Sequence, residues 1–274
     1  MRVLAIMGSP RGKGNTYRLV REIEDRLDGQ VEAEFEYLFL KDVNLQPCRG
    51  CGACLRTGEH ACPLADDRAA VEDRIAQSRG VILATPVYAM DMSWLMKLFL
   101  DRLAYRMHRP RFFDQVAMLV CTSGGSGTAE TLDRLGVVRH FGFSVAHRLG
   151  LLAPPVGVDP DYGAHERARA VETASRTYAR ALLDPRRAVP ALSDLMRFRT
   201  WQALASALRV RHPADYEYFR QRGWLERAAR YYYDAPVSPV KDLIARWVGR
   251  SVRGRLARAM GPQRSKADEH HAEG

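Results

Sequence analysis

The sequence predicts a doubly wound α/β protein, in which helices cover both faces of a five-stranded parallel sheet and a helical extension follows at the C-terminus. Over about the first 185 residues, short β-branched runs alternate with helical patterns, as they do in βαβ units. Several of these runs are apolar throughout, which is typical of central parallel strands covered on both faces. After residue 190 only helical patterns remain.

The expected strands and helices follow one another in chain order. The runs VLAIMG, GVILATPVY and QVAMLVCTS indicate central strands, whereas AEFEYLFL alternates and suits an edge. Strands are expected at 3–8, 33–40, 80–88, 115–123 and 147–154. Helices are expected at 15–28, 66–78 with Asp66-Asp67 as cap, 92–108, 126–140 and 163–183. In the extension they are expected at 191–209, 214–230 and 239–260.

A chain of 274 residues is long enough for one large domain with an appendage. We expect a sheet domain at 1–188, with a cysteine loop at 47–63, a helical extension at 189–262 and a disordered tail at 263–274. The first apolar run is too short for a signal peptide, and no stretch approaches the roughly 18 apolar residues of a membrane span. A cytoplasmic location is therefore expected.

The net charge of +10 is distributed unevenly. Residues 1–188 contain 26 Lys and Arg against 23 Asp and Glu, and residues 189–274 contain 16 against 9. The sheet domain is thus near neutral, and nucleic acid is not an expected partner.

The loop after the first strand has the composition of a phosphate site. It reads GSPRGKGNTYRL, in which a turn lined by small hydroxyl residues leads into a helix whose first amides attract phosphate. Gly8 and Gly12 enclose too few residues for a Walker loop, and the dinucleotide pattern G-x-G-x-x-G is absent. We expect a monophosphate here, with a plain strand-to-helix turn as the alternative. The residues expected to bind it are Ser9, Arg11, Asn15 and Thr16.

Two more loops leave the same edge of the predicted sheet. The third strand ends in TPVYAMDMSWLMK and the fourth in CTSGGSGTAETL. The first loop places a proline and an aromatic residue at the strand end, and the second places Gly124 and Gly125 where a planar ring can approach the backbone closely. Because doubly wound sheets bind ligands at this edge, we expect the three loops to form one site.

The motifs GSPRGKGNT, TPVY with the following LMKLFLDR, and TSGG resemble those of the NADPH-dependent FMN reductases, a branch of the flavodoxin-like superfamily. The resemblance covers about residues 1–185 and implies a flavodoxin-like fold, bound FMN and NAD(P)H as a candidate electron donor. It implies that the FMN phosphate is held by Ser9, Arg11, Asn15 and Thr16, the ring and ribityl chain by Pro86, Val87 and Tyr88, and the other side of the ring by Ser123, Gly124 and Gly125. One departure is Ala89-Met90-Asp91, where the family often has a small or glycine-containing step.

Four of the five cysteines stand close together, at Cys48, Cys51, Cys54 and Cys62. A reducing cytosol disfavours a disulfide staple, and zinc sites usually combine two separated Cys-x-x-Cys knuckles. The spacing is C-x2-C-x2-C-x7-C, in which three cysteines at successive intervals of three suit one face of a cubane, so we expect a [4Fe–4S] cluster, with zinc and free thiols left open. The motif also resembles that of the iron–sulfur flavoproteins, which carry such a cluster next to FMN. Cys121 is expected in the core.

The expected function is that of an FMN-dependent oxidoreductase that passes electrons between a donor and an acceptor, each a small molecule or a redox protein. Because the flavin supplies the chemistry, no catalytic side chain is expected. The alternatives are an electron-carrier module without its own substrate and a zinc-stabilised binding protein without flavin.

The extension contains an amphipathic helix and many aromatic residues. In LIARWVGRSVRGRLARAM one face holds Leu243, Ile244, Trp247, Val248, Val252 and Leu256, with arginines mostly opposite. We expect this face to pack on the body or on a partner subunit, with peripheral contact with an anionic membrane as the less favoured alternative. The resemblance implies at least a homodimer. The aromatic residues Trp201, Trp224, Trp247 and Tyr231–Tyr233 also predict a homo-oligomer.

Overall fold

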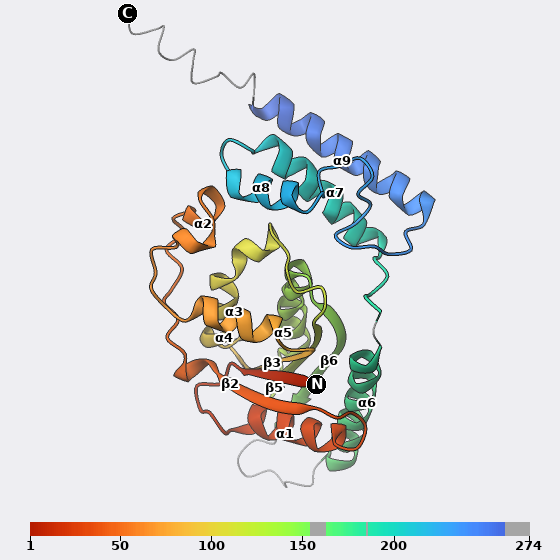
Figure 1. Cartoon of the computed structure of the whole chain (residues 1–274). Coiled ribbons are helices and arrows are strands. Elements are labelled where there is room, and N and C mark those ends of the chain that lie inside the picture. Colours follow the sequence, from red (N-terminus) through yellow and green to blue (C-terminus); the bar gives the residue numbers. More distant parts are fainter. Residues whose placement is uncertain (154–162, 185, 261–274) are drawn as a thin grey trace, which may run out of the picture. The chain divides into compact units, whose positions relative to one another are not determined.

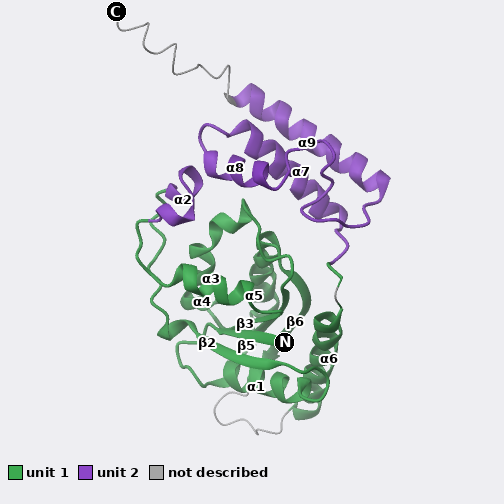
Figure 2. Ribbon diagram, viewed as in Figure 1, with its two compact units in different colours: residues 1–51, 63–187 green, residues 52–62, 188–274 purple. Residues whose placement is uncertain are grey.

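The computed structural model describes residues 1–153, 163–184 and 186–260 (Figure 1). By its internal contacts the chain forms two compact units, coloured separately in Figure 2. The sheet unit comprises residues 1–51 and 63–187, and the helical unit comprises residues 52–62 and 188–274. The domain limits expected from the sequence stay predictions, and the expected tail at 263–274 lies outside the described residues.

The sheet unit is built on parallel strands in the order β2-β1-β3-β5-β6. A short further strand, β4, pairs antiparallel with the end of β3. The strands are β1 (Arg2–Met7), β2 (Glu34–Phe39), β3 (Gly80–Tyr88), β4 (Asp91–Met92), β5 (Val116–Ser123) and β6 (Ser144–Leu152). The predicted doubly wound sheet of five parallel strands is confirmed. Strand order reverses between β1 and β3, so the carboxyl ends of these two strands form the switch point.

Helices cover both faces of the sheet because successive strand side chains point to opposite sides. In β1, Val3 and Ala5 pack with α1 and α6, whereas Leu4 and Ile6 pack with α3, α4 and α5. The helices of this unit are α1 (Asn15–Leu27), α3 (Arg68–Ala76), α4 (Trp94–Arg102), α5 (Thr128–Leu135) and α6 (Ala164–Leu183), with 3₁₀ turns η1 (Leu40–Asp42), η3 (Ala104–Met107) and η4 (Gly136–Phe141).

Several element limits differ from the prediction for local reasons. Strand β6 begins at Ser144, and its pairing with β5 shifts register after Ala117. The helices expected at 92–108 and 126–140 end early, and the 3₁₀ turns η3 and η4 follow them. The helix expected at 214–230 ends at Gln221. It ends there because Gly223 has a φ of 68° and the Trp224 amide donates to the carbonyl of Phe219, as at many helix C-termini.

In the helical unit, α9 packs along α7, and the short α2 packs against α8 (Figure 2). The elements are α2 (Ala53–Arg56), η2 (Glu59–Ala61), α7 (Leu192–Ala207), α8 (Pro213–Gln221) and α9 (Pro239–Met260). The core is aromatic: the ring of buried Trp224 lies 5.2 Å from that of Phe219 and 4.8 Å from that of Tyr232, centre to centre. Much of the aromatic surface is thus buried within this unit. The expected homo-oligomer stays a prediction.

Of the expected apolar face of α9, Val248, Val252 and Leu256 are half-buried, and the packing of this face on the body or on a partner subunit stays a prediction. Its exposed members are Leu243 (62%), Ile244 (42%) and Trp247 (65%). The side that meets α7 carries the fully buried Ala245 and also Gly249, where an added Cβ would lie 3.0 Å from the Cβ of Arg199. No helix among the described residues, α9 included, is long and apolar enough to cross a membrane.

Candidate functional site

The three predicted loops lie together at the carboxyl ends of β1, β3 and β5. The Gly8 amide donates to the Ala84 carbonyl at 2.7 Å, and the Ser93 hydroxyl donates to the Gly8 carbonyl. The buried hydroxyls of Thr16 and Thr122 lie 2.7 Å apart. These bonds tie the loop after β1 and the start of α1 to the ends of β3 and β5.

The loop that ends at Gly14 has the features of an anion site. The Ser9 hydroxyl is buried and accepts a hydrogen bond from the Arg11 amide at 3.3 Å. Asn15 is exposed at the start of α1, whose first turn contains no acidic residue. The Thr16 hydroxyl is engaged by Thr122, so we expect Thr16 to act through its helix-terminal amide.

Lys41 is a residue that sequence reasoning did not select. Its Cε lies 3.0 Å from the position of a Cβ on Gly12, so the lysine side chain crosses the loop. Its ammonium pairs with Asp42 at 2.5 Å. Lys41 follows β2, and only the pairing of β1 with β2 brings it to this loop, which is why no local motif indicated it.

The glycine pair after β5 fits a flat ligand. Neither Gly124 nor Gly125 has a positive φ, and a Cβ added to either would meet no atom within 4 Å. The protein's own backbone and packing therefore do not require glycine here, whereas a ring lying against the backbone would. Ser123 stabilises the backbone of the glycine pair. Its hydroxyl donates to the Ser126 carbonyl and accepts from the Gly125 amide at 3.2 Å.

The segment after β3 turns back as a two-residue hairpin. Pro86 and Val87 are half-buried, and the exposed Tyr88 pairs with Asp91. The residues between that pair are Ala89 and Met90, with φ values of 49° and 64°. Two positive φ values characterise a type I′ turn, which favours glycine and asparagine. Ala89 and Met90, which stand where the family often has a small or glycine-containing step, therefore occupy a turn whose backbone conformation is strained for residues with a side chain.

Contacts from α5 and the β5 loop hold this strained hairpin. Arg134 donates to the Met90 carbonyl at 2.7 Å and lies 3.5 Å from the Asp91 carboxylate. A Cβ on Gly127 would lie 2.9 Å from Cγ1 of Val87 and 3.1 Å from the Cα of Met90. The two loops are thus closely packed, while the Met90 side chain itself is 44% exposed.

The cysteines fall into two classes. Four are exposed or half-buried, namely Cys48, Cys51, Cys54 and Cys62, and none of the five cysteines, all of them described, forms a disulfide. The backbone between them turns at Gly50 and Gly52, with φ values of 64° and 68°. Cys121 is buried in β5 as expected, and burial raises the pKa of its thiol to about 12. Cys54 lies in α2, so the helical unit supports its part of the loop through α8.

The two ends of the cysteine loop are joined within the sheet unit in what we call the neck. The amides of Asn44 and Gln46 donate to the carboxylates of Asp67 and Asp66, each at 3.0 Å. Arg102 donates twice to Asp66, at 2.9 and 3.0 Å, and both side chains are buried. Burial raises the pKa of Asp66, but hydrogen bonds from Arg102 and from backbone amides outweigh it, and the pKa lies below its usual value. Asp67 is the N-cap residue of α3 but makes no side-chain cap hydrogen bond, so the predicted cap pair fixes the loop ends instead.

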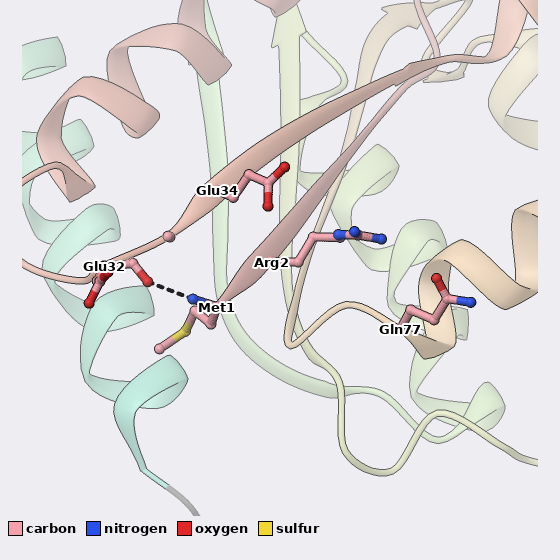
Figure 3. Close-up of a pocket in the computed structure, with 6 residues that line it drawn as sticks. Met1, Arg2, Glu32, Glu34 and Gln77 are labelled. Atoms are coloured by element: carbon pink, nitrogen blue, oxygen red, sulfur yellow. Dashed lines mark hydrogen bonds between the residues drawn. The ribbon is translucent and has the colours of Figure 1, made fainter.

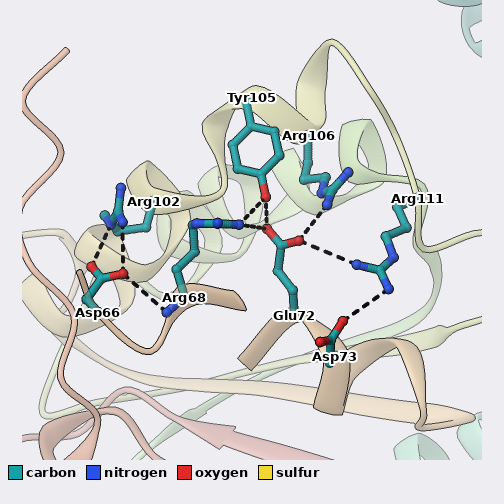
Figure 4. Close-up of polar contacts among 8 residues, drawn as sticks. All are labelled: Asp66, Arg68, Glu72, Asp73, Arg102, Tyr105, Arg106 and Arg111. Atoms are coloured by element: carbon teal, nitrogen blue, oxygen red, sulfur yellow. Dashed lines mark hydrogen bonds and ion pairs between the residues drawn. The ribbon is translucent and has the colours of Figure 1, made fainter. Parts of the chain in front are cut away.

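A second buried carboxylate lies beside the neck (Figure 4). Glu72 is 2% exposed, accepts a hydrogen bond from Tyr105, and pairs with Arg106 at 2.5 Å and Arg68 at 3.2 Å. Burial raises the pKa of the Tyr105 phenol, which stays protonated and donates. These contacts join α3 to η3 and give the neck a rigid base.

A hollow of about 690 Å³ lies elsewhere on the sheet unit (Figure 3). It is lined by Met1, Arg2, Glu32, Ala33, Glu34 and Gln77. Its residues surround the amino ends of β1 and β2, at the edge of the sheet opposite to the three loops. Because doubly wound sheets bind ligands at the carboxyl edge, we assign no cofactor to this hollow.

Residues 1–147, more than half of the chain, match the family model described as NADPH-dependent FMN reductase. The chain belongs to this family. The family inferred from the loop motifs is thereby confirmed, and its enzyme class is that of FMN-dependent oxidoreductases.

An iron–sulfur flavoprotein of Archaeoglobus fulgidus is 28% identical over 229 residues, 82% of this chain and 100% of that protein. An iron–sulfur flavoprotein of Methanocaldococcus jannaschii is 38% identical over 102 residues, 37% of this chain and 51% of that protein, so this match spans about half of the relative.

Solved structures share the fold at low sequence identity. RosB with its bound intermediate, 8-demethyl-8-formylriboflavin-5'-phosphate, has a TM-score of 0.53 at 13% identity, covering 66% of this chain and 79% of RosB. An FMN-dependent NADH-azoreductase from Bacillus anthracis, in complex with FMN, has a TM-score of 0.50 at 12% identity, covering 65% of this chain and 100% of that one. At these identities the likeness establishes the flavodoxin-like fold alone.

Proposed function

We propose that this protein is an FMN-dependent oxidoreductase that also holds a [4Fe–4S] cluster and passes electrons between a donor and an acceptor. The main observation in support of the flavin site is the pair Gly124-Gly125, because the protein's own structure does not require glycine at these two positions. Bound FMN supplies the transfer of electrons singly or in pairs. The family description makes NADPH the first donor to test. A small-molecule or redox-protein acceptor and a homo-oligomeric assembly stay predictions.

In this proposal the chain binds and orients the cofactor, and no side chain moves a proton. The loop after β1 and the start of α1 hold the phosphate, and the side chain of Lys41, whose ammonium pairs with Asp42, lies against this loop. The hairpin after β3 and the glycine step after β5 hold the ring. The proposed FMN contacts are Ser9, Arg11, Asn15, Thr16, Lys41, Pro86, Val87, Tyr88, Ser123, Gly124 and Gly125.

The proposed cluster ligands are Cys48, Cys51, Cys54 and Cys62. Their accessible thiols and the glycine turns between them suit a loop that wraps a metal group. Thiolates bind both iron–sulfur clusters and zinc, so the choice of cluster rests on the spacing and on the names of the relatives. The neck at Asp66 and Arg102 supports the ligands indirectly, because it fixes the ends of their loop.

An anaerobic absorption spectrum with flavin, iron, sulfide and zinc analysis tests both cofactors. We expect FMN together with about four irons and four sulfides per chain. Cys54→Ala should lose the cluster and keep the flavin, while Cys121→Ala, the matched control in the core, should keep both. FAD, or no flavin after reconstitution, contradicts the FMN site. Stoichiometric zinc without acid-labile sulfide contradicts the cluster.

The strained hairpin favours a second candidate function, an electron carrier without its own substrate. The exposed Met90 side chain belongs to the hairpin that this proposal places against the flavin ring. If it obstructs NADPH, Met90→Ala and Met90→Gly should both raise kcat/KM for NADPH oxidation, because both remove the bulk. An increase with glycine alone would instead assign the effect to turn strain. Rapid NADPH oxidation by the unaltered protein would exclude the carrier function.

A further inference from the structure

The outer face of α9 is an unpartnered apolar surface on the helical unit. Its members are Val240, Leu243, Ile244 and Trp247, which are 67, 62, 42 and 65% exposed. Intervals of three and four residues place them on one side of the helix, and we call this set the α9 stripe. Exposing this much aliphatic and indole surface to water is unfavourable, so we expect a binding partner to cover the α9 stripe.

A buried ion pair sets the rotation of α9. The Asp242 carboxylate lies 2.8 Å from the guanidinium of Arg199 on α7, and Arg246 lies 2.8 Å from its other oxygen. Ala245 and Gly249 lie on the same side and make the close approach to α7. Because this side must face α7, the α9 stripe faces away from the interior of the unit.

Arginines continue the stripe along the helix, which corrects the expectation that they lie mostly opposite the apolar face. Arg250 follows Trp247 by three residues and Arg258 follows it by eleven, and both intervals return to the same side. Arg253 and Arg255 are exposed as well, and the ion pairs of α9 found among the described residues are those of Asp242. No acidic residue occurs from 243 to 260. The outer side of α9 is therefore apolar in its first half and cationic in its second.

We propose that α9 binds the surface of a membrane containing anionic phospholipid. The α9 stripe would enter the boundary between headgroups and acyl chains, and the arginines would contact the headgroup phosphates. A nucleic acid matches the charge but leaves the stripe in water. A second α9 helix matches the stripe but offers the arginines no acidic residue from 243 to 260. The helix lies on the surface, since it is not apolar enough to cross a bilayer.

Co-sedimentation of the full chain with vesicles tests the proposal. We expect binding to vesicles of phosphatidylcholine mixed with phosphatidylglycerol, and much weaker binding to phosphatidylcholine alone. Added salt should weaken the binding, because it screens the arginines. Emission from Trp247, taken as the difference between the full chain and its Trp247→Phe variant, should shift to the blue when vesicles are added.

Matched variants test the two halves of the helix separately. Leu243→Ser should lower the affinity about tenfold through lost apolar burial. Val210→Ser should leave the affinity unchanged, because Val210 is 69% exposed on the same unit but lies outside α9.

The arginines have a matched control of their own. Reversing Arg250 and Arg258 to glutamate should lower the affinity by more than about tenfold. Reversing the exposed Arg209 and Arg211, which have the same charge but lie outside α9, should have a much smaller effect.

Three results would overturn the proposal. One is equal binding to both vesicle types, and another is equal loss of binding in the two arginine pairs. The third is a chain that ignores vesicles and forms an oligomer that Leu243→Ser dissociates in light scattering, because that result assigns the α9 stripe to a second copy.

Discussion

In α1, Leu19, Val20 and Ile23 lie at helical spacing and are buried under the sheet, whereas in α9 the similarly spaced Leu243 and Trp247 are exposed. Both helices are amphipathic. The first packs through its apolar side, and the second packs through a side that carries an aspartate, an alanine and a glycine.

The difference teaches that periodicity identifies an amphipathic helix but not the side that meets the protein. The sheet offers α1 an apolar face, so burial of apolar surface decides its orientation. Helix α7 offers α9 the buried guanidinium of Arg199, and removing the partner of a buried charge costs about 3–5 kcal/mol. That cost is similar to the gain from burying two aliphatic side chains, at about 1.5–3 kcal/mol each.

The largest expected effect comes from removing the carboxylate that orients α9. Asp242→Leu leaves Arg199 without its buried partner and should lower the free energy of unfolding by about 3–5 kcal/mol in urea denaturation. Glu217→Leu, which breaks a solvent-exposed pair with Arg220 in the same unit, should lower the free energy of unfolding far less, because water screens that pair. The double variant Arg199→Met/Asp242→Leu should recover much of the loss. Equal costs for the two single variants would refute the orienting role of the pair.

Isoleucine occurs on both helices and permits a direct comparison. Ile23→Ala in α1 removes a fully buried side chain and should cost about 2–5 kcal/mol of unfolding free energy. Ile244→Ala in α9 removes a 42% exposed side chain and should change it by less than about 0.5 kcal/mol. Thermal unfolding without lipid measures both. A large loss from Ile244→Ala would show that the stripe is covered in solution.

Buried carboxylates in both units should confer acid sensitivity. Burial raises the pKa of Asp66 and of Asp242, but hydrogen bonds from their arginines outweigh it and hold each pKa below the usual 3.8. Because the folded pKa is the lower one, the stabilisation is full above about pH 4 and is lost as the pH falls through the folded value. Asp66→Asn should flatten the acid end of the profile of unfolding free energy against pH. The exposed Asp133→Asn is the control, and a profile unchanged by Asp66→Asn would contradict the role of the neck.

The smallest expected effect concerns the two glycines of α9. A Cβ on Gly254 would meet nothing within 4 Å, so Gly254→Ala should stabilise by about 1 kcal/mol through helix propensity. A Cβ on Gly249 would lie 3.2 Å from the Arg199 carbonyl, so Gly249→Ala should push α9 from α7 and destabilise by about 1 kcal/mol. Urea denaturation of both variants measures the difference. Equal stabilisation would mean that the α7–α9 contact is loose.

Local signals predicted the parts of the site that lie in continuous loops. The segments around Ser9, Pro86 and Gly124 were found because each follows an apolar strand, and parallel strands bring their carboxyl ends to one edge. Lys41 and Arg134 were missed because each reaches the loops from another element, through strand pairing or helix packing. The strain at Met90 was missed as well, because φ is set by the hairpin register rather than by the residue type.

By itself the sequence determined the doubly wound sheet, the three loops, the clustered cysteines and the amphipathic character of α9. All of these depend on residue spacing along the chain, where apolar periodicity and turn chemistry act over a few positions. Only the tertiary structure decided that Asp66 joins the ends of the cysteine loop and that Asp242 turns the apolar side of α9 outward. Each of those outcomes depends on an arginine far away in the sequence, because a buried charge must find its partner wherever the fold brings one.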